Sequence, residues 1–183
     1  MDDDGNVVAE RLHDDPRGHA EAIGPLLQAV LAQAGPVTAV AYGTGPGPFT
    51  GLRVGIAAAR TAALALGVPE LPVISHDAVA LAAFERGEGA PFLVVSDAKR
   101  REHYFTTYTG LDAARLPVRG ADPRVGPEAD MPPLPRVEGQ VRPALIGRIA
   151  ALRLAAGLAP ASGEALYLRS PDVTLSIPKR VRT

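Results

Sequence analysis

A glycine- and proline-rich loop followed at once by an apolar helix constrains the fold of this chain most strongly. The loop covers residues 43–49 (GTGPGPF), and the helix is predicted over residues 51–66, with Gly67 as its stop signal. Glycine permits positive φ and each proline fixes its own φ, so the loop is expected to be stiff. Short apolar strands are predicted on either side, over residues 37–41 and 71–74. This order of elements predicts an α/β sheet with short crossovers.

The rest of the first half continues the alternation. Apolar residues with helical spacing predict a helix over residues 19–34, and another is predicted over residues 75–86. A short strand is expected over residues 6–12, directly after a hairpin-turn dipeptide. A Gly- and Pro-containing breaker then divides the chain into a predicted N-terminal lobe, residues 1–89, and a C-terminal lobe, residues 90–183.

The second half is predicted to begin with two strands, over residues 92–96 and 103–108. Residues 110–143 are rich in Pro, Gly and charge, so they are expected to be mostly loop, with short strands such as Val137. A further short strand is predicted over residues 144–146, followed by a helix over residues 147–156.

Composition excludes several classes of protein. The chain has no cysteine, which excludes disulfides and thiolate chemistry, and its net charge of −1 does not favour strong RNA binding by the chain alone. The longest apolar stretch, residues 56–66, is interrupted by Arg60 and is shorter than a bilayer span. The sequence begins with MDDD rather than with a basic and apolar leader. We therefore expect a soluble, cytoplasmic protein with no contact with membranes.

Small residues recur at every fourth position of the helix after the loop: Gly51, Gly55, Ala59, Ala63 and Gly67. Small side chains let another backbone approach closely. Two interpretations stay open: this face packs on the protein's own sheet, or it faces outward and receives a partner.

The loop does not match the common phosphate-binding motifs. A P-loop needs Lys and Ser/Thr after its last glycine, but Leu52-Arg53 follows Gly51. The dinucleotide motif fails because Thr50 occupies the place of its third glycine. Thr50 is instead predicted to cap the helix. Gly45, Gly47 and Asp97 remain weak candidates for nucleotide contact.

The string GPGPFTGLRVG, residues 45–55, closely resembles the signature of the TsaB (YeaZ) family, which usually has Ser in place of Pro48. Three further motifs follow the family in order. RGHAE at residues 17–21 opens the preceding helix, DAKRREHY at residues 97–104 is similar to the family's DARRGEVY hairpin, and YLRSPD at residues 167–172 is similar to its C-terminal segment. The resemblance spans nearly the whole chain.

The resemblance implies a two-lobed fold of the actin, sugar-kinase and Hsp70 group. It also implies a non-catalytic dimerisation subunit, which supports a catalytic TsaD subunit in threonylcarbamoylation of N6 of adenosine 37 in tRNA. The implied partners are TsaD, the ATPase TsaE, tRNA through the complex, and a second copy of the chain when TsaD is absent. No cofactor of its own is implied, although ATP or ADP could lie at the subunit interface.

In the family the first two helices form the joint with TsaD. Mapped onto this sequence, the joint would contain His19, Ile23, Leu27, Thr50, Gly51, Arg53, Gly55, Ala59 and Ala63. Family members also begin with a strand pair that carries an Asp-Thr-Ser-like turn. This sequence lacks that pair. Either the true start lies further upstream, which we favour, or the fold lacks its first strands, and in both cases no nucleotide contact of that turn carries over.

No catalytic or metal site is predicted. The four histidines, His13, His19, His76 and His103, include no pair three or four residues apart. Residues 75–77 (SHD) contain the residue types of a hydrolytic triad, but adjacent side chains do not converge, and Ser75 is predicted to be a helix cap. Two alternatives stay open: a nucleotide-dependent kinase or ATPase of related fold, and a peptidase.

Overall fold

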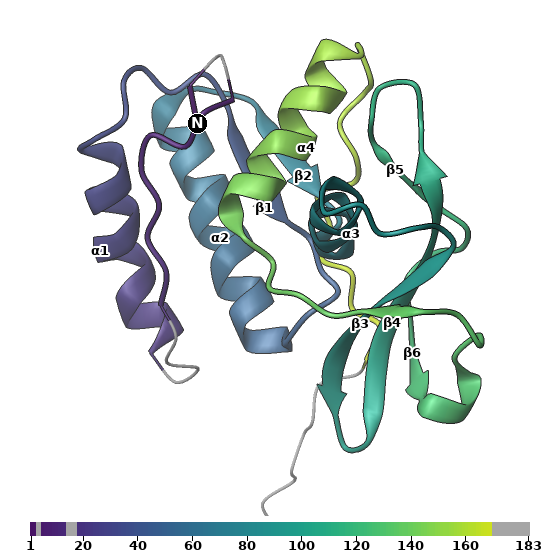
Figure 1. Cartoon of the computed structure of the whole chain (residues 1–183). Coiled ribbons are helices and arrows are strands. Elements are labelled where there is room, and N and C mark those ends of the chain that lie inside the picture. The colour runs from purple at the N-terminus through teal and green to yellow at the C-terminus, as the bar shows by residue number, and fades with distance from the viewer. Residues whose placement is uncertain (3–4, 14–17, 170–183) are drawn as a thin grey trace, which may run out of the picture.

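The computed structural model describes residues 1–2, 5–13 and 18–169, which form two β-sheets and the helices that pack on them (Figure 1). The smaller sheet pairs β1 (Val40–Gly43) with β2 (Glu70–Val73) in parallel. Helix α2 (Phe49–Leu66) connects the two strands, as parallel pairing requires. Helix α1 (His19–Leu31) runs alongside α2, and both lie at the left of Figure 1.

The larger sheet belongs to the second half of the chain. Its central strands are β3 (Phe92–Lys99) and β4 (Glu102–Leu111), which form an antiparallel hairpin. The remaining members are short: β5 (Pro117–Arg119) and β6 (Arg124–Pro127) pair with β4, and β7 (Arg136–Val137) pairs with β3 in parallel. A 3₁₀ turn, η1 (Glu128–Asp130), follows β6.

Helix α3 (Ser75–Glu85) lies between the two sheets and contributes to two of the three apolar cores among the described residues. On one side it packs with α4 (Pro143–Ala155) and the small sheet, and on the other with β3, β4 and β7. The first core therefore combines residues from before and after residue 89; its buried members are Leu71, Val73, Ala78, Leu81, Leu116, Ile146, Ile149 and Ala150. The predicted boundary at residue 89 separates the two sheets along the chain, but the packing crosses it, because α4 returns to β1 and β2.

Several sequence predictions of local structure are wrong. Residues 6–12 form no strand, and among the described residues no strand precedes β1. Exposed Val7, Val8 and Leu12 show that this segment has no strand partner to pack on. Residues 144–146 belong to α4, where Ile146 is buried in the first core.

Both predicted side-chain caps are also wrong, because each helix starts earlier than expected. Helix α2 has Pro48 at its N-cap, so Thr50 lies in the first turn. Helix α3 has Ile74 at its N-cap, and Ser75 is its first residue. The predicted stop at Gly67 is confirmed: it adopts φ 67°, the left-handed conformation that favours glycine.

Candidate functional site: the groove between helices α1 and α2

An open groove of about 600 Å³ lies between α1 and α2. Four of its lining residues come from α1 and seven from α2. They are Ile23, Gly24, Leu27, Leu31, Val54, Ala57, Ala58, Thr61, Ala62, Ala65 and Leu66. Not one of these side chains is charged, and Thr61 is the only polar residue among them. A concave surface with an apolar lining is a candidate binding site.

The groove exists because α2 is more apolar than its contact with the sheet requires. One side of α2, with Ile56 and Ala63, is buried against the body of the protein. A second apolar side faces α1, but its residues are mainly alanine. Small side chains leave space between two helices that larger ones would fill. The groove is therefore a consequence of alanine on α2 opposite leucine and isoleucine on α1.

The structure places two of the predicted interface residues in the groove, Ile23 and Leu27 of α1. His19 is the first residue of α1, and its side chain lies outside what the structure describes. Thr50 and Arg53 are exposed in the first turns of α2 but do not line the groove.

The predicted small-residue face of α2 is not one face of the helix. Residues four apart on an α-helix rotate by roughly 40° per step, since 3.6 residues complete a turn. The series therefore turns away from solvent along the helix. Gly51, Gly55 and Ala59 are half-buried, and Ala63 is 1% exposed in the protein's own core. The prediction that Ala63 faces a partner is thus wrong, and none of the four lines the groove.

Sequence reasoning missed the α2 residues that do line the groove. Val54, Ala58, Thr61 and Ala65 follow the spacing of three and four residues that marks one helix face. This signal was present in the sequence. Alanine is only weakly apolar, so a helix face made mainly of alanine gives a weak amphipathic pattern. The regular spacing of the glycines predicted the neighbouring positions instead.

The glycine-rich loop before α2 is occupied by internal contacts. Gly45 adopts φ 106°, its N–H donates to Ser75 Oγ at 3.1 Å, and its carbonyl accepts from the Ser75 N–H at 2.7 Å. Leu166 packs against Gly45 and donates its N–H to the Thr44 carbonyl. The backbone N–H of Gly45 is therefore not available to a phosphate. A Cβ on Gly47 would meet open space, so of the two loop glycines only Gly47 presents an open surface.

Asp97, the third weak nucleotide candidate, serves the β3–β4 hairpin. Its carboxylate accepts from the Lys99 N–H at 2.7 Å and pairs with Lys99 Nζ at 2.8 Å. These hydrogen bonds hold the pKa of Asp97 below its usual value. The arrangement fits the structural role of a turn residue.

Residues 75–77 do not form a catalytic triad. Ser75 Oγ accepts from the Gly45 N–H, whereas His76 lies between Thr106 Oγ1 at 2.8 Å and Ser96 Oγ at 2.9 Å. The three adjacent side chains therefore have separate partners. His76 is 1% exposed, and burial lowers its pKa to about 4, so the ring is neutral near pH 7.

Asp77 belongs to a separate network between α3 and the large sheet. It accepts from the Tyr108 hydroxyl at 2.7 Å and lies 3.7 Å from the guanidinium of Arg119. Burial raises its pKa, while Arg119 and the Tyr108 hydrogen bond oppose that rise. Burial likewise raises the pKa of Tyr108 well above its usual value.

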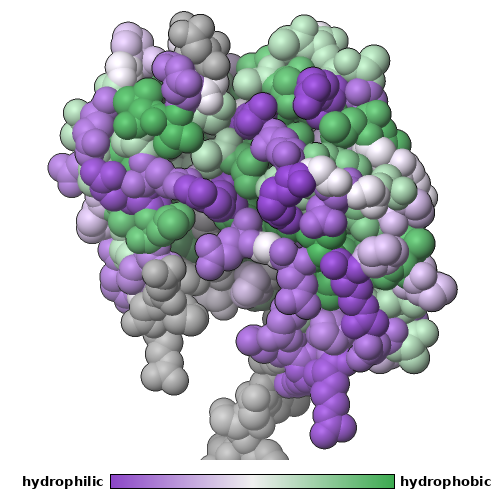
Figure 2. Space-filling model, in the orientation of Figure 1, coloured by the Kyte–Doolittle hydropathy of each residue, from purple (hydrophilic) through white to green (hydrophobic). Residues whose placement is uncertain are grey.

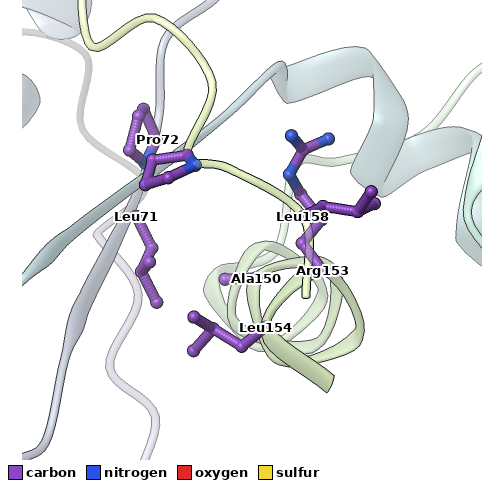
Figure 3. A pocket seen from close by; sticks show the side chains of 7 residues that line it. Leu71, Pro72, Ala150, Arg153, Leu154 and Leu158 are labelled. Atoms are coloured by element: carbon purple, nitrogen blue, oxygen red, sulfur yellow. The ribbon is translucent and has the colours of Figure 1, made fainter. Parts of the chain in front are cut away.

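A second hollow, between β2 and α4, is too small for a ligand. Figure 3 shows Leu71 and Pro72 facing Ala150, Arg153 and Leu154 across it. Its volume of about 10 Å³ is close to that of a single water site.

The structure also bears on two other kinds of site, a metal site and a membrane-spanning helix. Within the described residues, no cluster of three or more His, Cys, Asp or Glu side chains has the arrangement of a metal site. Helix α2 is long and apolar enough to meet the minimum for a membrane span by length and composition. In this fold it packs on β1 and α1, and it carries Arg53 and Arg60, which are costly in lipid.

The two helices that form the groove lie in the part of the chain that matches a known family. Residues 7–126, which include α1 and α2, match the family described as "TsaD: tRNA N6-adenosine threonylcarbamoyltransferase". An uncharacterized protein of Mycobacterium tuberculosis is 38% identical over 187 residues, covering 91% of this chain and 82% of that protein.

Two of the relatives are named TsaB. The Escherichia coli "tRNA threonylcarbamoyladenosine biosynthesis protein TsaB" is 35% identical, covering 51% of this chain and 42% of that protein. The corresponding Haemophilus influenzae protein is 37% identical over 49% of this chain and 40% of its own length.

Solved structures show the same fold. YeaZ from Pseudomonas aeruginosa superposes with a TM-score of 0.68 at 22% identity, covering 85% of this chain and 88% of that one. A protein described as similar to peptidase YeaZ from the same organism gives a TM-score of 0.71 at 23% identity, over 84% and 86% of the two chains. The family match and this likeness together bear out the predicted fold of the actin, sugar-kinase and Hsp70 group.

Proposed function

Because this chain belongs to the TsaB (YeaZ) family, we propose that it is a non-catalytic subunit of the machinery that makes threonylcarbamoyladenosine in tRNA, and that it binds the catalytic TsaD-type subunit. The observation that carries this proposal is the uncharged groove between α1 and α2. Its volume of about 600 Å³ is large enough to receive side chains of another protein.

The chemistry of the groove suits a helix of a partner protein. An amphipathic helix binds a groove by inserting apolar residues at intervals of three and four. The groove runs between two helices, and the exposed Leu66 lies within its lining. Apolar surface at a helix pair of this kind is stabilised when a second apolar surface covers it.

The family match supports a partner of the TsaD type. The matched family is named for the catalytic transferase, and the match includes both helices that form the groove. The Chelativorans "tRNA N6-adenosine threonylcarbamoyltransferase" is also 42% identical to this chain over 83 residues, although these cover only 22% of that protein. We infer that the catalytic subunit presents a related helix pair, so that the two proteins join through equivalent surfaces. Two copies of this chain would pair in the same way, as a symmetric dimer.

The same proposal includes the cellular compartment, the ATPase partner and a candidate site for nucleotide. The complex acts in the cytoplasm, where tRNA is modified, together with a TsaE-type ATPase. ATP or ADP, if it contacts this chain, would meet the surface near Gly47 rather than Gly45, whose N–H already binds Ser75. A peptidase is disfavoured by the separate partners of Ser75, His76 and Asp77.

The proposal is tested by mixing the purified chain with a TsaD-type catalytic subunit of the same organism and measuring the mass of the product in solution. We expect a one-to-one complex and a homodimer of the chain alone. Two separate monomeric species at micromolar concentration would contradict the proposal. An ATPase or kinase of the same fold would instead bind ATP tightly in isolation, which is measured on the same sample.

A further inference from the structure

The β3–β4 hairpin ends in a turn whose sequence conflicts with its conformation. Lys99 pairs with Glu102 across the hairpin, so Arg100 and Arg101 are the two residues of the connecting loop. Both have positive φ, 54° and 66°. Two-residue hairpin loops with positive φ at both positions are normally built from Asn and Gly, because other side chains are strained there.

The strained turn is retained with long basic side chains. Lys99 also has positive φ, 66°, so three consecutive basic residues occupy the left-handed region. Glycine or asparagine would form the same turn at lower conformational cost. Backbone strain of this kind clusters at active sites and ligand-binding sites. All three residues are exposed.

The hairpin end is held by internal contacts that engage its acidic side chains. Asp97 pairs with Lys99. Glu102 lies 3.6 Å from Arg169, which also donates to the Ala98 carbonyl at 2.5 Å. Arg169 therefore fixes the segment before the C-terminus against the hairpin.

The balance of charge at this end is positive. Among the described residues, Lys99, Arg100, Arg101 and Arg169 gather at this end, where Asp97 pairs with Lys99, Glu102 with Arg169 and the adjacent Glu128 with Arg136, in a chain whose net charge is −1. Figure 2 shows a strongly hydrophilic surface at the lower end of the second lobe, where Figure 1 places this hairpin, away from α1 and α2.

From these observations we propose that the β3–β4 hairpin end binds the phosphate backbone of RNA, and that it contacts the tRNA substrate while α1 and α2 hold the catalytic subunit. The identity of the RNA rests on the proposed function, but the contact itself requires only the chain. Arginine and lysine on an exposed turn bind phosphates without reading sequence, and each contact makes affinity depend on salt. The distance between hairpin and helices in the fold lets both partners bind at once.

The test is a titration of fluorescently labelled tRNA with the full chain alone, repeated over a series of salt concentrations that starts low. The key variant is Arg100→Asn combined with Arg101→Gly, which supplies the residues that this turn prefers. It is expected to melt at the wild-type temperature or above. Its affinity for tRNA should fall roughly tenfold, and the slope of log affinity against log salt should become shallower by about 2.

The matched control is Arg86→Asn combined with Arg115→Asn, which removes the same charge elsewhere. Arg115 is exposed, has φ 62° and lies in the next hairpin loop, so its replacement mirrors the turn substitution. This control should bind tRNA as the wild type does. Equal losses in both double variants, unchanged binding in the turn variant, or no binding by the wild type at the lowest salt would overturn the proposal.

The same variants separate this inference from the proposed function. The turn variant should still form the one-to-one complex with the catalytic subunit. A chain that binds tRNA through the hairpin but forms no complex would contradict the proposed function alone. A chain that forms the complex but loses no RNA affinity in the turn variant would contradict the hairpin contact alone.

Discussion

Replacing Ala65 by arginine is expected to lower the affinity of the chain for the catalytic subunit by roughly a hundredfold or more. Ala65 lines the groove on α2 and is exposed in the free chain, so the longer side chain can be accommodated before binding. In the complex the guanidinium would be covered by an apolar partner surface without a counter-charge. An unpaired buried charge costs about 3 kcal/mol or more, and each 1.4 kcal/mol is about a factor of ten in affinity.

The adjacent residue provides a matched control. Leu64 is 84% exposed and does not line the groove. Leu64→Arg therefore adds the same charge to the same turn of α2 but should leave the affinity within a fewfold of wild type. Both variants should keep the wild-type melting temperature and helical content. Similar affinities for the two arginine variants would place the partner elsewhere.

Acidification is expected to destabilise the chain through His76, by about 3 kcal/mol between pH 6.5 and pH 4. The pKa of His76 is about 4 in the folded chain, below the usual 6.5, because the ring is buried. The unfolded chain therefore binds a proton in this window that the folded chain does not. The contribution of the neutral ring is fully present above pH 6.5 and is lost as the pH falls toward 4. Each pKa unit of difference is worth about 1.4 kcal/mol.

Urea unfolding at a series of pH values measures this effect, with His76→Gln as the reference. Glutamine is polar but does not titrate, so the variant isolates the ring from the carboxyl groups. The variant is expected to be less stable than wild type at pH 7, and the difference should shrink as the pH falls to 4. A difference that stays constant across the window would show that folding does not lower the pKa of His76.

The central elements of the fold could be predicted from the sequence because each carries a strong local pattern. The helix after the glycine-rich loop, its stop at Gly67 and the strands of the β3–β4 hairpin are all found within a few residues of the prediction. Val137 was predicted as a strand and lies in β7. These segments have an apolar periodicity or a turn signal of their own.

Other elements depend on contacts that no local pattern reveals. Strands β5 and β6 are defined by their pairing with β4, across a stretch whose composition indicates loop. Residues 6–12 have the composition of a strand, but a strand requires a neighbour, and the described residues provide none. Residues 144–146 are helical because α4 covers the small sheet.

The candidate site was predicted in part. The sequence singled out the two helices that form the groove and two of its lining residues on α1, Ile23 and Leu27. The positions that the sequence predicted on α2 lie four residues apart. Successive members of this series are rotated around the helix, so that Ala63 is buried in the core. The exposed face of a helix therefore follows from its packing rather than from the sizes of its residues.

The most direct test of the account uses the absence of cysteine in the chain. A single cysteine, Ala65→Cys, carries a short photo-activated cross-linker in the groove, and Arg115→Cys carries the same reagent in a hairpin of the second lobe. With the catalytic subunit present, we predict cross-links to that subunit from position 65 and none from position 115. Cross-links from position 115 with none from position 65 would contradict docking at the groove between α1 and α2.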